Sequence, residues 1–258
     1  MKKIYALFLF FPAVLFSQHN NNNLRIIYEL TFQIDSLNPA SKASEYMFLE
    51  IDEGISVFKS QTVHLKDSIL DSKSPQGIFG ISKSKFNYKI FKDLKNEELI
   101  SLYDFTSYKY KIKTRLPGLT WQIENEKKVI IGYETTLART RFKGRDYEAW
   151  FTPNIPIAEG PYKFYGLPGL ILEIQDSKNH YHFKALGIQK IRNSVIILDK
   201  DYTQIIEADL KVFLRKIKEK PSLILNNPGI NIPKEGMDKY DRNQRARLQY
   251  ENNPIELE

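Results

Sequence analysis

The chain has 258 residues, of which 42% are hydrophobic and 13% aromatic, and it contains no cysteine. This composition supports a hydrophobic core in one domain of about 200–250 residues or in two smaller ones. Without cysteine there are no disulfides, no thiolate nucleophile and no cysteine-ligated zinc or iron–sulfur cluster. The formal charge of +7 at pH 7 suggests nucleic acid or membrane binding, so the position of the charge matters.

The first residues have the pattern of a secretory signal peptide. Lys2 and Lys3 precede an apolar stretch that runs from Ile4 to Phe16. This stretch is shorter than the about 20 residues that a membrane-spanning helix needs. Residues 1–17 are therefore expected to be a signal peptide, and no transmembrane anchor is expected.

The expected cleavage near Ser17/Gln18 leaves residues 18–23 as a flexible leader and places the protein in the periplasm or outside the cell. A lipoprotein is excluded because the chain has no cysteine to carry the lipid. Cleavage also leaves 36 Lys+Arg against 31 Asp+Glu, a charge of +5 that is interleaved with acids, as in Glu124–Lys128. This pattern favours a solvated surface of mixed sign over a nucleic acid partner.

Alternating apolar and polar residues predict a series of antiparallel strands. The strands are expected at 24–34, 45–51, 84–91, 104–113, 119–123, 129–133, 135–142, 146–152, 170–174 and 180–190. Residues 124–128 are expected to form a polar hairpin turn and residues 143–145 another. A helix or an irregular insertion is expected between 55 and 72. The connections are local, so the fold class is mainly β, a curved antiparallel meander sheet.

One C-terminal amphipathic helix is expected to pack on this sheet. Thr203 is its predicted N-cap and Pro221 ends it. Its apolar stripe consists of Ile206, Leu210, Phe213 and Ile217. Residues 24–225 are expected to form a single β-rich domain, and residues 226–258 an extended, charged tail.

A proline-rich stretch between residues 153 and 168 predicts a stiff, ordered loop, because proline disrupts both helix interiors and central strands. The loop ends in Leu167–Leu170, where Pro168 and Gly169 predict a type II turn. The same four residue types recur at Leu116–Leu119. We interpret this recurrence as one turn used twice, with a duplicated unit as the alternative.

The stretch around this turn resembles a known family. The motif residues are Gly166, Leu167, Pro168, Gly169, Leu170 and Ile171, and they resemble the hexapeptide for which the GLPGLI family is named. Ala149–Pro153, Gly160–Phe164 and the terminal Asn253–Leu257 extend the resemblance, whereas Leu137–Ala138 departs from the family's frequent Lys–Ala.

The resemblance implies an exported protein of a Gram-negative bacterium, often encoded near outer-membrane transport or signalling genes. It implies no catalytic residues and no cofactor. The hairpin pattern also resembles the half-barrels of periplasmic lipoprotein carriers, an analogy of fold that does not determine function.

Few residues suggest chemistry. His180 and His182 have the spacing of two imidazoles on one face of a strand, which makes them weak metal candidates without a third ligand. Asp146 and Glu148 share a face, and Glu173 is expected to be partly buried. There is no Gly-x-Ser-x-Gly or His-Glu-x-x-His motif, so no catalytic residues are assigned.

The leading hypothesis is an exported, non-enzymatic binding protein of the bacterial envelope that carries an apolar ligand, a peptide or a protein on its curved sheet. The possible binding surface consists of Trp121, Trp150, Phe164 and Glu173. The alternative is a structural or interaction subunit associated with an outer-membrane transport system. A third hypothesis is a metal-binding protein or hydrolase.

Overall fold

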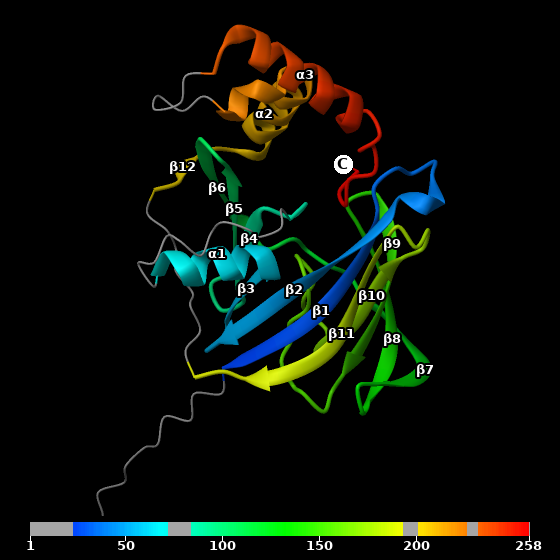
Figure 1. Ribbon diagram of the computed structural model, residues 1–258. Coiled ribbons are helices and arrows are strands. Elements are labelled where there is room, and N and C mark those ends of the chain that lie inside the picture. The colour runs from blue at the N-terminus through cyan, green and yellow to red at the C-terminus, as the bar shows by residue number, and fades with distance from the viewer. Residues whose placement is uncertain (1–22, 72–83, 193–200, 226–231, 258) are drawn as a thin grey trace, which may run out of the picture.

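The computed structural model describes residues 23–71, 84–192, 201–225 and 232–257. In these residues twelve strands form one open, curved sheet, accompanied by three α-helices (Figure 1). The expected signal peptide and most of the leader lie outside the described residues. None of the helices in the described ranges has the length and apolar character that crossing a membrane requires.

The sheet consists of two meanders joined side by side. The first contains β1 (Leu24–Gln33), β2 (Lys42–Asp52), β3 (Ile55–Ser60), β4 (Tyr88–Asp93), β5 (Glu98–Phe105) and β6 (Tyr108–Arg115). The second contains β7 (Gln122–Ile130), β8 (Tyr133–Phe142), β9 (Arg145–Thr152), β10 (Leu170–Asp176) and β11 (Tyr181–Lys190). β1 and β11 pair antiparallel and join the meanders, while the short β12 (Thr203–Gln204) pairs parallel with β6. The predicted fold class is confirmed.

The proline-rich loop fills the inside of the curve. Tyr162 contacts the ring of Tyr88 on β4, with centroids 5.9 Å apart, while Phe164 contacts Tyr147 on β9 at 4.7 Å. β4 and β9 lie six places apart in the sheet. One short segment can touch both only from the concave side, so the loop forms part of the core, where Phe164 is fully buried.

A buried lysine on β4 also holds this loop in place. The ammonium group of Lys92, on β4, donates to the carbonyl oxygens of Gly160 (2.7 Å) and Phe164 (2.9 Å) and lies 2.6 Å from the carboxylate of Glu159. These three oxygens match the three donors of a lysine. Burial lowers the pKa of Lys92, and Glu159 opposes that effect. The loop is thus fixed by both apolar packing and an internal ion pair.

One predicted turn and one predicted strand were wrong. Residues 124–128 lie within β7, which has a bulge between Ile123 and Lys127, and the hairpin turn follows at Ile131 and Gly132. β7 is an edge strand, and such strands often carry charged residues that resemble a turn. The strand expected over 104–113 is a hairpin, because the chain turns between β5 and β6 at Thr106, whose φ is +55°.

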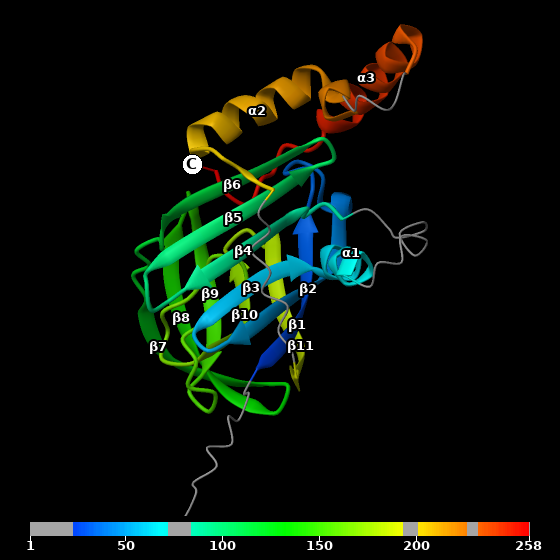
Figure 2. The ribbon, with the colours of Figure 1, turned by 90° about the vertical axis from the view of Figure 1, so that its left-hand side faces the viewer.

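The helices also differ from expectation. The weakly periodic region from 55 to 72 contains β3 and then α1 (Gln61–Asp71). α2 (Glu207–Glu219) begins later than predicted, because Thr203 belongs to β12, and the carboxylate of Asp209 accepts from the Ile206 N–H at 3.4 Å. As predicted, α2 packs on the sheet: Phe213 contacts rings of the β5–β6 hairpin, such as Tyr110 at 4.9 Å (Figure 2).

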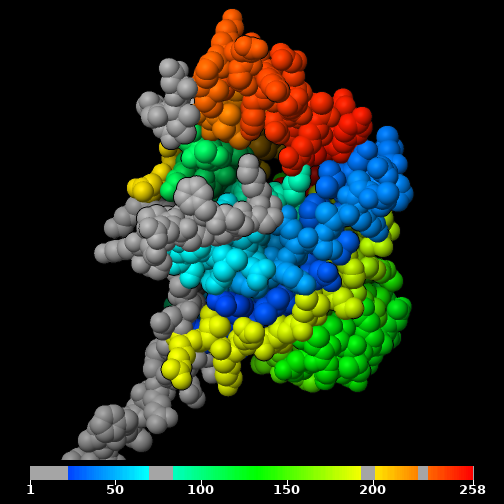
Figure 3. Space-filling model, viewed as in Figure 1, coloured from blue at the N-terminus to red at the C-terminus, as the bar shows by residue number. Residues whose placement is uncertain are grey.

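The described part of the segment 226–258, residues 232–257, is not an extended tail. It contains α3 (Lys234–Leu248), whose buried Asp241 accepts from the Ser222 N–H at 2.6 Å and the Ser222 hydroxyl at 2.9 Å. This charged helix lacks apolar periodicity, which is why the sequence did not reveal it. Beyond α3 the chain returns to the sheet, and Figure 3 shows this last segment in red against the blue turn after β1, where Asn252 accepts from the Ser36 N–H at 2.8 Å.

Candidate functional site

The GLPGLI motif has a structural role. The Gly169 N–H donates to the Leu167 carbonyl at 2.7 Å, and the Leu170 N–H donates to the Ile155 carbonyl at 3.0 Å. The predicted type II turn is wrong, because it would direct the Leu170 N–H to Leu167. A Cβ atom at Gly169 would lie 2.1 Å from the Thr152 carbonyl oxygen. Glycine is needed there because the motif crosses closely over the end of β9.

The second Leu-Pro-Gly-Leu stretch forms a different structure. A Cβ atom at Gly118 would meet nothing within 4 Å, and Gly118 does not have a positive φ. Tyr165, just before the GLPGLI motif, nevertheless contacts the region of the second stretch: the Trp121 indole N–H donates to the Tyr165 carbonyl at 2.9 Å, and the Tyr165 hydroxyl donates to the Pro117 carbonyl at 2.6 Å. One turn used twice is therefore not what the structure contains.

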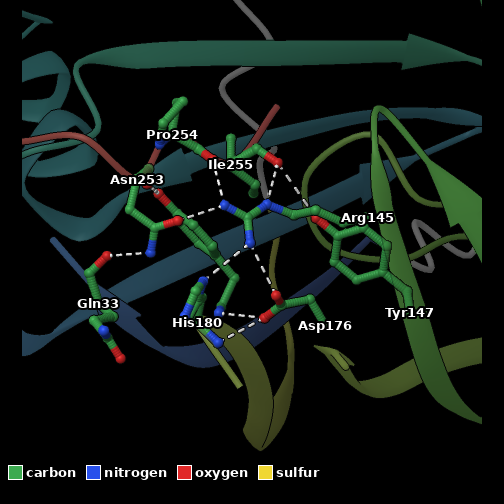
Figure 4. Close-up of polar contacts among 9 residues, drawn as sticks. Gln33, Arg145, Tyr147, Asp176, His180, Asn253, Pro254 and Ile255 are labelled. Carbon is green, nitrogen blue, oxygen red and sulfur yellow. Dashed lines mark hydrogen bonds and ion pairs between the residues drawn. The ribbon is translucent and has the colours of Figure 1, made fainter. Parts of the chain in front are cut away.

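Arg145 holds the C-terminal segment against the sheet (Figure 4). Its guanidinium donates to the side chain of Asn253 (2.7 Å), the carbonyl of Pro254 (2.7 Å) and the carbonyl of Ile255 (3.1 Å). It also forms a buried ion pair with Asp176 at 2.9 Å. We call this group the Arg145 clasp.

The rest of the Arg145 clasp is also well supplied with hydrogen bonds. The Asp176 carboxylate accepts the backbone N–H groups of His180 and Tyr181, each at 2.7 Å. The Tyr181 hydroxyl donates to the Asn253 carbonyl at 2.6 Å. Burial raises the pKa of Tyr181 to about 12, although the charge of Arg145 lowers it. This phenol therefore stays a donor at neutral pH, and we interpret the cluster as structural.

The two metal candidates lie in different environments. His180 is part of the Arg145 clasp, with Nδ1 at 3.4 Å from the guanidinium. His182 contacts the carboxylate of Glu173 through Nε2 at 2.9 Å. Among the described residues there is no group of three or more His, Asp and Glu side chains arranged to hold a metal ion.

Glu173 sits in a polar cluster with Lys128, Trp150 and His182. Lys128 lies 2.8 Å from the Glu173 carboxylate and 4.3 Å from the centroid of the Trp150 ring. Burial raises the pKa of Glu173, but the hydrogen bonds and charges of His182 and Lys128 outweigh burial and lower the pKa to about 2. The carboxylate is thus held ionised and is not suited to act as a general acid at neutral pH.

This lowered pKa predicts a pH-dependent contribution to stability. Because the pKa of Glu173 is lower in the folded state than its ordinary value of 4.5, the contribution is complete above that value and is lost as the pH falls towards 2. We expect the free energy of unfolding of the wild type to fall by about 1–2 kcal/mol through this group as the pH is lowered, and Glu173→Gln to remove that fall. The figure is smaller than the full pKa shift would give, because Lys128 is partly exposed. Urea unfolding at several pH values measures it. Glu134→Gln, in the exposed Lys127–Glu134 pair, is the control; equal pH dependence in wild type and Glu173→Gln would contradict the prediction.

The four residues of the expected binding surface do not form one surface. The prediction that Phe164 lies on a surface is wrong, because this residue is fully buried on the concave side of the sheet. Trp150 and Glu173 share the polar cluster just described. Trp121 lies elsewhere and lines a hollow next to the β8–β9 hairpin.

This hollow has a volume of about 500 Å³. Trp121 and four charged residues line it: Arg139, Arg141, Asp146 and Glu148. Arg139 pairs with Glu148 at 3.1 Å and Arg141 with Asp146 at 3.2 Å. Thr120, Thr140 and Ser177, which carry aliphatic hydroxyl groups, also line it, together with Gln122 and Tyr147. We call it the Trp121 hollow.

The sequence predicted only part of the Trp121 hollow. Trp121 was predicted as a binding residue. Asp146 and Glu148 were expected to share a face, which is confirmed because both are solvent-accessible in β9 while Tyr147 between them is buried. Arg139 and Arg141 were missed. Their alternation along the predicted strand over 135–142 places them on one face, opposite Thr140 and Phe142, and that pattern was a usable signal.

Comparisons with known proteins give a family and a fold. Residues 140–173 match the family described as "Protein of unknown function (Porph_ging)", which is the GLPGLI family domain. No curated protein matches the sequence.

Two matching solved structures are of PNGF-II, one in space group P21 and the other in C2. The first has a TM-score of 0.57 at 14% identity and the second 0.56 at 15% identity. Each match covers 76% of this chain but only 34% and 33%, respectively, of the PNGF-II chain. The chain thus spans about a third of the structures it matches, and at this identity the similarity shows the fold alone.

Proposed function

Residues 140–173 match the GLPGLI family domain, and from this match we propose that the chain is a non-enzymatic binding protein of the bacterial envelope. In this proposal the signal peptide is cleaved near Ser17/Gln18 and the exported protein binds its ligand at the Trp121 hollow. The observation that carries the proposal is the convergence of a tryptophan, four charged residues and three residues with aliphatic hydroxyl groups on one concave site. Concave sites with a few convergent polar groups are the usual place for a ligand.

The site differs from the one expected of an apolar carrier. A carrier of the half-barrel type uses the inside of its curved sheet. Here that space contains the proline-rich loop, with Tyr162, Phe164 and Leu167 all buried. The described residues therefore favour a ligand on the exposed side of the β8–β9 hairpin over an apolar molecule within the sheet.

The second candidate function is an interaction subunit for an outer-membrane transporter or another envelope protein. What favours it is that 76% of this chain matches only a third of the longer PNGF-II chain. A fold that forms part of a longer chain is suited to act beside other domains. We expect such a partner to crosslink to surface residues outside the hollow, and crosslinks confined to the hollow would count against it.

The test of the proposal uses tryptophan fluorescence. The chain has two tryptophans, so Trp150→Phe leaves Trp121 as the single reporter, and its emission should change saturably when an undialysed envelope extract of a GLPGLI-encoding bacterium is added. The double variant Arg141→Leu/Asp146→Leu in the Trp150→Phe background should lose that response, because it removes one ion pair of the hollow. An unchanged Trp121 emission with the extract would overturn the proposal.

A matched control separates the hollow from general surface charge. The pair Lys127–Glu134 is as exposed as Arg141–Asp146, with side-chain exposures of 58% and 63% against 68% and 64%. Neither Lys127 nor Glu134 lines the hollow. Lys127→Leu/Glu134→Leu should therefore keep the full response. Loss of the response in both double variants would assign it to nonspecific charge.

A further inference from the structure

The Trp121 hollow has properties that restrict the chemical class of its ligand. Two guanidinium groups and two carboxylates line it, so its formal charges balance. An anion bound there would meet Asp146 and Glu148, and a cation would meet Arg139 and Arg141. The electrostatics of the site therefore favour a ligand without net charge.

The same groups supply many hydrogen bonds. Arginine provides five donors in a plane, and a carboxylate provides two acceptor oxygens. The ion pairs at 3.1 and 3.2 Å are exposed, and exposed pairs exchange partners at little cost. A ligand with several hydroxyls, each both donor and acceptor, can use both members of each pair.

The aromatic wall supplies apolar contact. The indole N–H of Trp121 already donates to the Tyr165 carbonyl, so the part of the ring left for a ligand is carbon. The motif segment also lies against the ring. A Cβ atom at Gly166 would be 3.8 Å from the indole nitrogen of Trp121. A fixed aromatic ring binds C–H surfaces without losing much conformational entropy.

We propose that the Trp121 hollow binds a neutral saccharide. A sugar ring combines the required features: no net charge, hydroxyls around its edge and C–H groups on its faces. A volume of about 500 Å³ lies within the range of small-molecule sites, about 300–1,000 Å³. This inference rests on the proposed function and names the class of ligand for the same site.

The test titrates the Trp150→Phe variant with three neutral trisaccharides: maltotriose, mannotriose and N,N′,N″-triacetylchitotriose. At least one should change the Trp121 emission saturably with a Kd of about 1 mM or tighter. The Arg141→Leu/Asp146→Leu substitution should weaken that binding by about tenfold or more, since it removes charged hydrogen bonds. The Lys127→Leu/Glu134→Leu substitution should change the Kd by less than about twofold. Trp121→Ala should also lose trisaccharide binding, which calorimetry measures in this variant. Its melting temperature checks that the variant is folded.

Other outcomes overturn the inference in distinguishable ways. Binding of inorganic phosphate or spermidine, with no response to the trisaccharides, would show that the site takes a charged ligand. If the envelope extract changes the emission equally before and after periodate oxidation, which destroys vicinal diols, the saccharide class fails while the binding function stands. Abolition by protease treatment instead would identify a peptide. No response to the extract or to any trisaccharide overturns both the inference and the proposed function.

Discussion

Gly169→Val is expected to lower the free energy of unfolding by about 4 kcal/mol or more, a large part of the typical stability of a domain. Its Cβ atom would lie 2.1 Å from the Thr152 carbonyl oxygen and 2.9 Å from the Pro153 nitrogen. These are backbone atoms at the start of the proline-rich loop, and they have little freedom to move. Equilibrium unfolding in urea, followed by circular dichroism, measures the change.

The second Leu-Pro-Gly-Leu stretch provides the matched control. Gly118→Val should change stability by less than about 0.5 kcal/mol, because nothing lies within 4 Å of the added Cβ atom and φ is not positive. The two variants share the Leu-Pro-Gly-Leu sequence but differ in tertiary surroundings and in backbone conformation. Equal stability loss at both positions would show that the effect comes from the Leu-Pro-Gly-Leu sequence and not from the close approach to β9.

Arg145→Ala is the second substitution with a large expected effect. It leaves the Asp176 carboxylate buried without its cation and removes three contacts to residues 253–255. Breaking a buried ion pair on one side costs about 3–5 kcal/mol. We expect a loss of that size in urea unfolding, together with faster hydrogen exchange of the amides in 253–257.

Arg141→Ala is the control for this substitution. Arg141 lies on the same hairpin and also pairs with an aspartate, but its side chain is 68% exposed, whereas that of Arg145 is 3% exposed. Exposed pairs contribute about 0–1 kcal/mol. If Arg145→Ala cost no more than Arg141→Ala, or left the exchange of 253–257 unchanged, the Arg145 clasp would not hold the C-terminal segment.

The strands were the most predictable part of the structure. A strand was expected over 170–174, and β10 (Leu170–Asp176) contains it. The turn at 143–145 was confirmed because Lys143 and Gly144 have positive φ between β8 and β9, as tight hairpins require. In both cases the information is local, since it lies in a few neighbouring residues.

The errors concern interactions between distant segments. Phe164 was assigned to a binding surface as one of several aromatic residues, and only the curvature of the sheet shows that the loop carrying it lies inside. Arg145 was expected in a turn, and its partners lie 108–110 residues later. No local pattern signals such a contact. The resemblance through Asn253–Leu257 pointed to this segment without indicating what it binds.

The Arg145 clasp has a consequence for the order in which the chain folds. β8 and β9 are neighbours in sequence and can pair early, but Arg145 remains without three of its acceptors until residues 253–255 are present. Asn253 also donates to the Gln33 carbonyl in β1, 220 residues away. Contacts at such separation form late and slow folding. During synthesis, Arg145 and Asp176 can pair once both have emerged, but Arg145 stays without these three acceptors until residues 253–255 follow.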